Sequence, residues 1–166
     1  MAKAALSAGM RTMTMHTGHL GLIGQQPPTV PTQNAALCYR ITKGKPEVLL
    51  ITSRGTGRWV LPKGWPIDGL SPAAGAAQEA WEEAGVKGTV RDDPIGRFVY
   101  AKVLSAKRII PCLAHVFALQ VSTLADKFPE AGQRQRAWFS PKKAATRVDE
   151  PELAALLRRF DPRDLA

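Results

Sequence analysis

The sequence predicts an α+β fold in which a mixed β-sheet carries helices on its faces. Strand-like segments outnumber helical ones, and the two kinds do not alternate strictly, as they would in a doubly wound parallel sheet. The length of 166 residues suits a single domain with one core and one site. No apolar run approaches the roughly eighteen residues that a membrane-spanning helix needs, so we expect no membrane partner.

Residues 1–33 are predicted to form a flexible N-terminal arm, and residues 34–166 the folded domain. The arm has no sustained periodicity and ends in QQPPTVPTQ, whose closely spaced prolines disfavour both helix and sheet. The chain has no acidic residue before Glu47, as in transit peptides. Because Lys3 and Arg11 are the arm's only Lys or Arg residues and no amphipathic pattern is visible, we favour a plain arm.

The first half of the domain predicts three strands and one helix. Residues 35–42 and 47–52 read as a β-hairpin, because KGKP between them supplies turn residues. RWVLP at 58–62 reads as a short strand that Pro62 ends, and the loop KGWPIDGLSP follows. Ser71 followed by Pro72 is typical of the beginning of a helix, with Ser as the N-cap and Pro in the first turn. Gly85 can adopt the left-handed backbone conformation that ends a helix. The helix is therefore predicted over residues 72–84.

The second half predicts two long strands and shorter elements after them. PIGRFVYAKVL (94–104) and RIIPCLAHVFALQV (108–121) read as strands, and RAWFS (136–140) as a short one. Ser140 before Pro141 repeats the helix-start signal. Pro151 begins a final helix with apolar residues at Leu153, Leu156, Leu157 and Phe160.

Three glutamates on the 72–84 helix carry the main chemical signal. Glu79, Glu82 and Glu83 are three and four residues apart, which places their carboxylates on one helical face, where like charges repel. A hard divalent cation such as Mg²⁺, which prefers oxygen ligands and often shares them with substrate phosphates, would relieve this repulsion. Taken alone, EAWEEAG also fits an ordinary solvated helix face.

The surrounding residues favour the metal interpretation. GWPIDGLSPAAGAAQEAWEEAGV resembles the Nudix box, G-x5-E-x7-R-E-U-x-E-E-x-G-U, and matches it at Gly64, Glu79, Glu82, Glu83, Gly85 and Val86. The flanking LLITSRGTGRWVLPKGWP and GQRQRAWFSP resemble the diphosphoinositol polyphosphate phosphohydrolase branch of that family. This resemblance, over roughly residues 33–158, implies a three-layer α/β/α Nudix sandwich.

Three box positions depart from the pattern. Leu70 stands at the first Glu, Gln78 at the Arg and Ala80 at the bulky aliphatic place. If the first two positions form an ion pair in relatives, the loss of both charges together leaves no unpaired charge behind. The orientation of the remaining carboxylates, and hence the reaction rate, is the property that these changes affect.

The resemblance implies that Glu79, Glu82 and Glu83 hold Mg²⁺ or Mn²⁺, with the Gly64 carbonyl as a further ligand, and that water then attacks phosphorus. The general base is expected to be Glu83 or Glu82. Glu130, in DKFPEAGQ, is a more distant candidate because relatives often bring an acidic residue from a later loop, although a plain loop role is favoured for it.

Substrate binding is assigned to basic and loop residues near the box. The resemblance makes Arg54 and Arg58 the strongest phosphate-binding candidates; planar guanidinium groups suit repeated phosphate contacts. We add three loop or strand-end residues: Ser53, Lys63 and Trp65. Each of the other basic residues is expected to be an ordinary solvated surface charge: Arg97, Lys102, Lys107, Arg108, Arg134 and Arg136.

The remaining aromatic and sulfur residues are expected to be structural. Trp59 and Trp138 should pack in the core, and Trp81 should pack the box helix onto the sheet. Cys38 and Cys112 lie in apolar stretches without a CxxC pair, which indicates buried free thiols and a reducing, cytoplasmic setting.

A formal charge of +9 indicates a polyanionic partner, but charge alone does not separate a phosphorylated metabolite from nucleic acid. The motifs favour hydrolysis of a phosphoanhydride in a diphosphoinositol or diadenosine polyphosphate, with nucleic acid the less favoured partner. Two alternatives stay open: a nucleotide-sugar or nucleoside triphosphate pyrophosphatase, and a degenerate Nudix module that binds a phosphorylated ligand or RNA without turnover.

Overall fold

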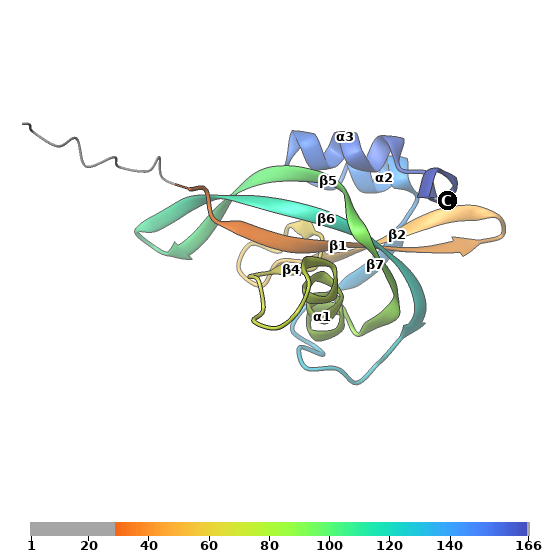
Figure 1. The fold of residues 1–166 in the computed structure, drawn as a ribbon, viewed down its shortest axis with the longest axis horizontal. Helices are drawn as coiled ribbons and strands as arrows, with labels where there is room; N and C mark the ends of the chain where they lie inside the picture. Colours follow the sequence, from red (N-terminus) through yellow and green to blue (C-terminus); the bar gives the residue numbers. More distant parts are fainter. Residues whose placement is uncertain (1–28, 166) are drawn as a thin grey trace, which may run out of the picture.

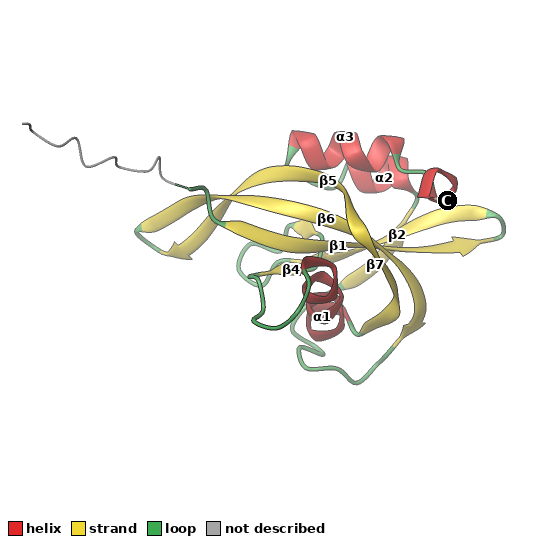
Figure 2. Ribbon diagram, viewed as in Figure 1, coloured by secondary structure: helices red, strands yellow, loops and turns green. Residues whose placement is uncertain are grey.

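The computed structural model describes residues 29–165, in which a mixed seven-stranded sheet lies between two helical layers (Figure 1). The strand order is β3-β2-β1-β6-β5, with β4 paired to β1 and β7 to β2. β1 and β6 run parallel, and the other pairs are antiparallel. The helix α1 covers one face and α2 with α3 the other (Figure 2). The predicted three-layer sandwich is confirmed.

The elements have the following bounds: β1 Thr32–Thr42, β2 Lys45–Thr52, β3 Trp59–Val60, β4 Lys63–Gly64, α1 Pro72–Ala84, β5 Val86–Ser105, β6 Arg108–Leu124, β7 Arg136–Phe139, α2 Pro141–Ala145, α3 Pro151–Arg159 and the 3₁₀ turn η1 Pro162–Leu165. The predicted hairpin and the three helices are therefore present. Lys63 and Gly64, predicted as loop, form the short strand β4 instead, because their backbone pairs with β1.

The first strand begins three residues earlier than predicted, at Thr32 instead of Ala35. Thr32 and Gln33, assigned to the arm, belong to β1, and Gln33 is fully buried. The prolines did not prevent this, because proline is tolerated at a strand start and the Pro31 carbonyl still accepts a hydrogen bond from Leu113 N at 2.9 Å. The rest of the predicted arm, residues 1–28, lies outside the described residues.

β5 is also longer than predicted. It begins directly after α1 and continues through RDDPIG, where the register against β6 shifts between Val90 and Pro94 and again between Pro94 and Gly96. Such shifts accommodate a proline within a strand, since its missing N–H and fixed φ are tolerated at bulges. Polar residues and a proline are not typical of a strand, so the sequence did not predict the first half of β5.

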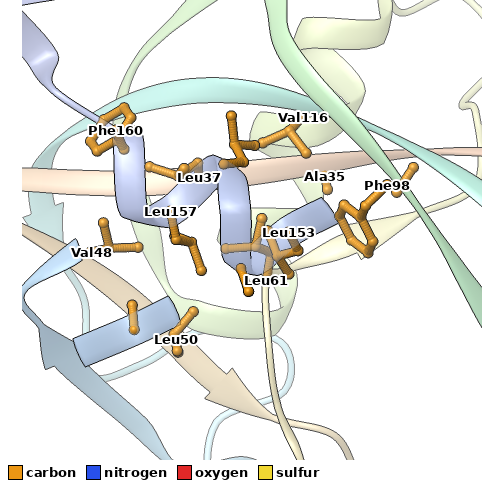
Figure 3. Close-up of a cluster of buried hydrophobic side chains, with 14 of the residues drawn as sticks. Ala35, Leu37, Val48, Leu50, Leu61, Phe98, Val116, Leu153, Leu157 and Phe160 are labelled. Atoms are coloured by element: carbon orange, nitrogen blue, oxygen red, sulfur yellow. The ribbon is translucent and has the colours of Figure 1, made fainter. Parts of the chain in front are cut away.

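Two buried clusters hold the layers together. Leu37, Leu50, Leu153, Leu157 and Phe160 belong to the cluster between the sheet and the α2–α3 layer (Figure 3). On the opposite face, α1 packs through small residues: Ala73, Ala76, Ala80 and Ala84. An alanine face lets the helix axis lie close to the sheet, which limits the freedom of the glutamates that α1 carries.

The tryptophan predictions are confirmed in part. Trp59 and Trp138 are partly buried against the two clusters. Trp81 belongs to neither cluster; its ring contacts the sheet through the Lys87 ammonium of β5, which lies 4.5 Å from the ring centre. The alanines leave no space for a large ring beneath the helix. Across residues 29–165, no helix is long and apolar enough to cross a membrane.

Candidate active site

The ends of α1 are fixed by the signals that the sequence contains. The Ser71 side chain accepts a hydrogen bond from Ala74 N at 3.2 Å, and Pro72 occupies the first turn. Gly85 ends the helix in the left-handed conformation at φ 69°. The three box glutamates therefore lie in the last two turns of a helix whose register is set at both ends.

Gly64 forms a cradle for Glu79. A Cβ atom at position 64 would lie 2.0 Å from the Glu79 Oε1 atom and 2.1 Å from its carboxyl carbon, so this carboxylate lies directly against the glycine backbone. A side chain at position 64 would therefore force the Glu79 carboxylate to move. The conformation therefore requires the first glycine of the box for steric reasons, and it brings Glu79 to the backbone whose carbonyl was predicted to be a metal ligand.

The electrostatics at Glu79 are those of a crowded acidic site. Burial raises the pKa of Glu79 to about 7, and repulsion from Glu83, Glu82 and Glu130 adds to the increase. A pKa near neutrality means that the ionised form lacks sufficient positive charge nearby. A divalent cation would supply that charge.

Glu83 lies in a buried ion-pair network. Its Oε1 accepts a hydrogen bond from Arg134 Nη2 at 2.6 Å, and its Oε2 accepts one from the Lys63 backbone N–H at 3.3 Å. Arg134 also donates from Nε to Glu130 Oε2 at 2.8 Å. Burial nevertheless raises the pKa of Glu83, although the Arg134 and Lys63 charges oppose this.

Glu82 is oriented by the residue that replaced the box arginine. Gln78 donates from Nε2 to Glu82 Oε1 at 2.6 Å, one helical turn along α1. The Glu82 carbonyl also accepts a hydrogen bond from Glu130 N at 3.0 Å, which attaches the loop after β6 to the helix. The neutral Gln78 thus supports a box carboxylate without adding a charge.

These donors suit a hard divalent cation, since all are carboxylate or carbonyl oxygens and they repel one another when no cation is present. In the structure, however, the carboxylates do not point to one common position. Within residues 29–165, no group of three Asp, Glu, His or Cys side chains is arranged to hold a metal ion. Glu82 and Glu83 face Gln78 and Arg134 instead. Holding a cation requires these side chains to turn toward Glu79.

A basic cavity of about 510 Å³ opens beside the carboxylates. Its wall includes Glu83 and five basic residues, namely Arg54, Arg58, Lys63, Lys102 and Arg134. The Lys63 ammonium lies 4.8 Å from the centre of the Tyr100 ring, and burial lowers the pKa of Lys63 to about 8. A cavity with this lining favours an anion that reaches Glu83 at one end.

The predicted binding residues meet at this cavity to different degrees. Ser53 lines it but also holds the turn that carries the two arginines, since its Oγ accepts from Arg58 N at 3.1 Å. Trp65 is 41% exposed and does not line the cavity. The Lys102 ammonium lies 5.2 Å from the centre of its ring. The structure thus groups Arg54, Arg58 and Lys63 and leaves Trp65 at the periphery.

The other basic residues divide clearly. Lys102 and Arg134 join the cavity, whereas Arg97, Lys107 and Arg108 are exposed and lie outside its lining. Arg136 has a structural role: its Nη1 donates to Ala84 O at 2.9 Å and Ala125 O at 2.7 Å, which satisfies a carbonyl at the end of α1.

Several residues of the site were underestimated or missed. Glu130 is brought to the carboxylates by its bond to Arg134, although a plain loop role was favoured for it. Asp149 and the buried Glu150 contact Arg58 Nη1 at 3.0 Å and 3.5 Å, and no motif pointed to either. Only the tertiary fold brings the residue before α3 to the turn after β2.

Comparison with known proteins agrees with this geometry. Residues 31–160 match the NUDIX domain model. Nudix hydrolase 13, a mitochondrial protein of Arabidopsis thaliana, is 36% identical over 107 residues, which cover 61% of this chain and 53% of that protein. Diphosphoinositol polyphosphate phosphohydrolase 3-alpha of Homo sapiens is 30% identical over 112 residues, covering 66% of this chain and 64% of that protein. The chain spans about half the length of the plant relatives it matches.

Solved structures support the same fold at lower identity. The C. elegans Ap4A hydrolase has a TM-score of 0.58 and 22% identity, covering 83% of this chain and 100% of that chain. The NUDIX domain of Shewanella oneidensis NrtR, solved with ADP ribose, has a TM-score of 0.58 and 13% identity, covering 86% and 95%. Because the family model spans most of the chain and its fold is the one observed, this protein belongs to the Nudix family, with similarity to the diphosphoinositol polyphosphate phosphohydrolase branch.

Proposed function

We propose that this protein is a hydrolase that uses a divalent metal ion to cleave a phosphoanhydride bond in a highly phosphorylated small molecule, either a diphosphoinositol or a diadenosine polyphosphate. The observation that carries the proposal is the meeting of Glu83 with five basic residues around one cavity. The names of two relatives, a diphosphoinositol polyphosphate phosphohydrolase and an Ap4A hydrolase, supply the two substrate classes.

Glu79, Glu82, Glu83 and the Gly64 carbonyl would hold the metal, which we propose to be Mg²⁺ or Mn²⁺. Such an ion neutralises phosphate oxygens and lowers the pKa of a bound water. The protein's own contribution is positional. Gly64 admits the Glu79 carboxylate, Gln78 orients Glu82, and Arg134 with Lys63 holds Glu83 at the cavity wall.

Glu83 is our candidate for the general base, because its carboxylate lines the cavity and burial raises its pKa. A carboxylate with a raised pKa accepts a proton from water more readily than an ordinary surface glutamate. Glu82 and Glu130 are the alternatives, and Glu130 is supported by its bond to Arg134 in the same network.

Arg54 and Arg58 are proposed to bind phosphates remote from the reacting bond, because both line the cavity on a turn held by Ser53. A cytoplasmic location is likewise a proposal, supported by two buried free thiols, Cys38 and Cys112.

The deciding experiment is phosphate release from a panel that includes a diadenosine polyphosphate, a diphosphoinositol polyphosphate, ADP-ribose and a nucleoside triphosphate. We expect turnover of one or both polyphosphates with Mg²⁺ or Mn²⁺, no turnover with chelator, and recovery when metal is restored. Turnover that survives thorough chelation would contradict the metal assignment. Tight binding of the panel without any turnover would favour the degenerate binding module instead.

A further inference from the structure

The far end of the β5–β6 hairpin is a ribbon of two strands. β1 pairs with β6 only from Leu113 onward, and β5 is the last strand of the sheet. The hairpin residues 99–113, here called the distal ribbon, therefore extend past the start of β1 and past both helical layers, at the left of Figure 1. Two strands without a third have little core of their own, so side chains on such a ribbon stay exposed unless a partner covers them.

One face of the distal ribbon consists of apolar side chains. Residues directly opposite each other on paired strands share a face, and every second residue along a strand returns to it. Three cross-strand pairs form this face: Val99–Leu113, Ala101–Pro111 and Val103–Ile109. Val103 and Ile109 are 63% and 64% exposed, and with Val99 and Leu104 they make four of the eight large hydrophobic side chains exposed in residues 29–165. Such clustering marks an interaction surface, whereas single exposed hydrophobic residues are ordinary.

The charge of the ribbon indicates which kind of partner fits this surface. Lys107 and Arg108 are exposed at its turn. The sequence contains four Lys or Arg residues but no Asp or Glu between Asp93 and Asp126. A second copy of the chain would bring the same cations against one another, and nucleic acid offers phosphates without an apolar layer. Basic and apolar side chains side by side suit a lipid surface, which has anionic headgroups above an apolar interior.

The geometry of the turn determines which side chains would enter such a surface. Surface-bound elements reach roughly 5 to 10 Å into the boundary between headgroups and acyl chains, and a strand rises about 3.3 Å per residue. That depth takes in the two or three residues next to the turn on each strand, which include Leu104 and Ile109. The long apolar stems of Lys107 and Arg108 let their charged groups stay at the level of the headgroups. Ile109 also lines an apolar cavity of about 410 Å³ on the ribbon.

We propose that the distal ribbon binds reversibly to an anionic lipid surface, with Leu104 and Ile109 below the headgroups and Lys107 and Arg108 in contact with the lipid phosphates. The expectation of no membrane partner rested on the absence of an apolar run that could span a bilayer, whereas a surface contact needs none. Residues 100–103 of β5 line the basic cavity, so the bound surface would lie next to the proposed active site. The inference goes beyond the proposed hydrolysis and does not depend on it.

Cosedimentation of the full chain with vesicles tests this, using phosphatidylcholine alone and equal parts of phosphatidylcholine and phosphatidylserine. We expect binding to the mixed vesicles that weakens as salt is added, and little binding to phosphatidylcholine alone. Leu104→Ser combined with Ile109→Ser should reduce the partition coefficient roughly tenfold or more, because two buried apolar side chains are lost. Lys107→Ser and Arg108→Ser should each reduce it roughly fivefold and make it less sensitive to salt.

The β1–β2 hairpin, at the opposite end of the sheet in Figure 1, supplies matched controls. Ile41 is 50% exposed and Lys45 is exposed on it, so Ile41→Ser and Lys45→Ser remove the same kinds of group elsewhere. Both should bind the mixed vesicles like the unmodified chain. A thermal melt checks that each variant is folded, which is expected because all of the changed side chains are exposed.

Four outcomes would overturn the proposal. They are absence of binding to the mixed vesicles at low salt, equal binding to phosphatidylcholine alone, equal losses in the control variants, and undiminished binding after the Leu104 and Ile109 changes. Sedimentation velocity without vesicles examines the second copy: self-association that the same two changes abolish, without vesicle binding, would assign the ribbon to a dimer instead. Vesicle binding needs no turnover, so it can succeed or fail separately from the proposed hydrolysis.

Discussion

Gly64 shows at the scale of one residue how backbone space controls chemistry. The Glu79 carboxylate occupies the position where any other residue would place its Cβ. The same carboxylate carries a pKa of about 7, caused mainly by burial and then by three neighbouring glutamates. Steric fit and charge crowding therefore act on the same group, so a small change at Gly64 should affect metal binding more than folding.

We predict that Gly64→Ala lowers metal affinity and catalytic efficiency by about 10- to 100-fold, the range found when the support of a metal ligand is disturbed. The methyl group would displace the Glu79 carboxylate, which is the flexible end of a side chain, so the fold should persist. Calorimetric titration with Mn²⁺ and a thermal melt measure the two effects. Gly55→Ala is the control, because a Cβ there meets nothing within 4 Å. Unchanged Mn²⁺ affinity in Gly64→Ala would refute the cradle.

A second prediction separates the reacting centre from the phosphate contacts. Glu83→Gln should lower turnover on every substrate, because Glu83 lines the cavity and is the proposed general base. Arg54→Ala or Arg58→Ala should instead reduce catalytic efficiency by about ten- to a hundredfold on polyphosphates, at roughly 1.5 to 3 kcal/mol for a charge-assisted contact, and much less on ADP-ribose. Equal losses on all substrates for the arginine variants would contradict the phosphate-binding role, and full activity in Glu83→Gln would remove that residue from catalysis.

At the scale of elements, the start of α3 reaches the turn after β2. Glu150, at the N-cap of α3, is 8% exposed and contacts Arg58 Nη1 at 3.5 Å. Its Oε2 has no hydrogen-bond partner among residues 29–165. A buried carboxylate with an unsatisfied oxygen lowers stability unless another charge compensates it. Arg58 and Lys63 provide that compensation, since the Glu150 charge opposes the lowering of the Lys63 pKa.

We therefore predict that Glu150 positions Arg58. Glu150→Gln should lower catalytic efficiency on a polyphosphate by roughly three- to tenfold, and the loss should nearly disappear in an Arg58→Ala background, as expected for two residues that act as one unit. Asp149→Asn is the control, because that side chain is 63% exposed and surface ion pairs contribute little. The same loss in both backgrounds would show that Glu150 acts independently of Arg58.

At the scale of the whole molecule, the net charge is +9, and five of the 23 Lys and Arg residues line a single cavity. Such a field raises the encounter rate of an anion and is screened by salt over about 10 Å at 0.1 M ionic strength. Catalytic efficiency on a polyphosphate should thus fall roughly tenfold between low and high salt, and less steeply on ADP-ribose. A salt series at constant free Mg²⁺ measures this; equal slopes for both substrates would argue against steering.

The sequence by itself determined the local parts of this protein. Ser71, Pro72 and Gly85 specify α1 because caps and turn residues act within a few residues of the chain, and the helix begins and ends where they predict. The hairpin of β1 and β2 follows for the same reason, as do the family and the three-layer fold that the box implies. The carboxylate triplet was readable because helical spacing alone puts its members on one face.

Only the tertiary structure decided which distant residues meet those local parts. Three such contacts join residues 48, 51 and 92 positions apart in the sequence: Glu130 with Glu82, Arg134 with Glu83, and Glu150 with Arg58. Pairings of this kind carry no local signature, because loop closure depends on how the sheet twists and how closely the alanine face of α1 packs. The distal ribbon is likewise decided in three dimensions, because β1 begins opposite Leu113 and leaves the end of the β5–β6 hairpin without a third strand.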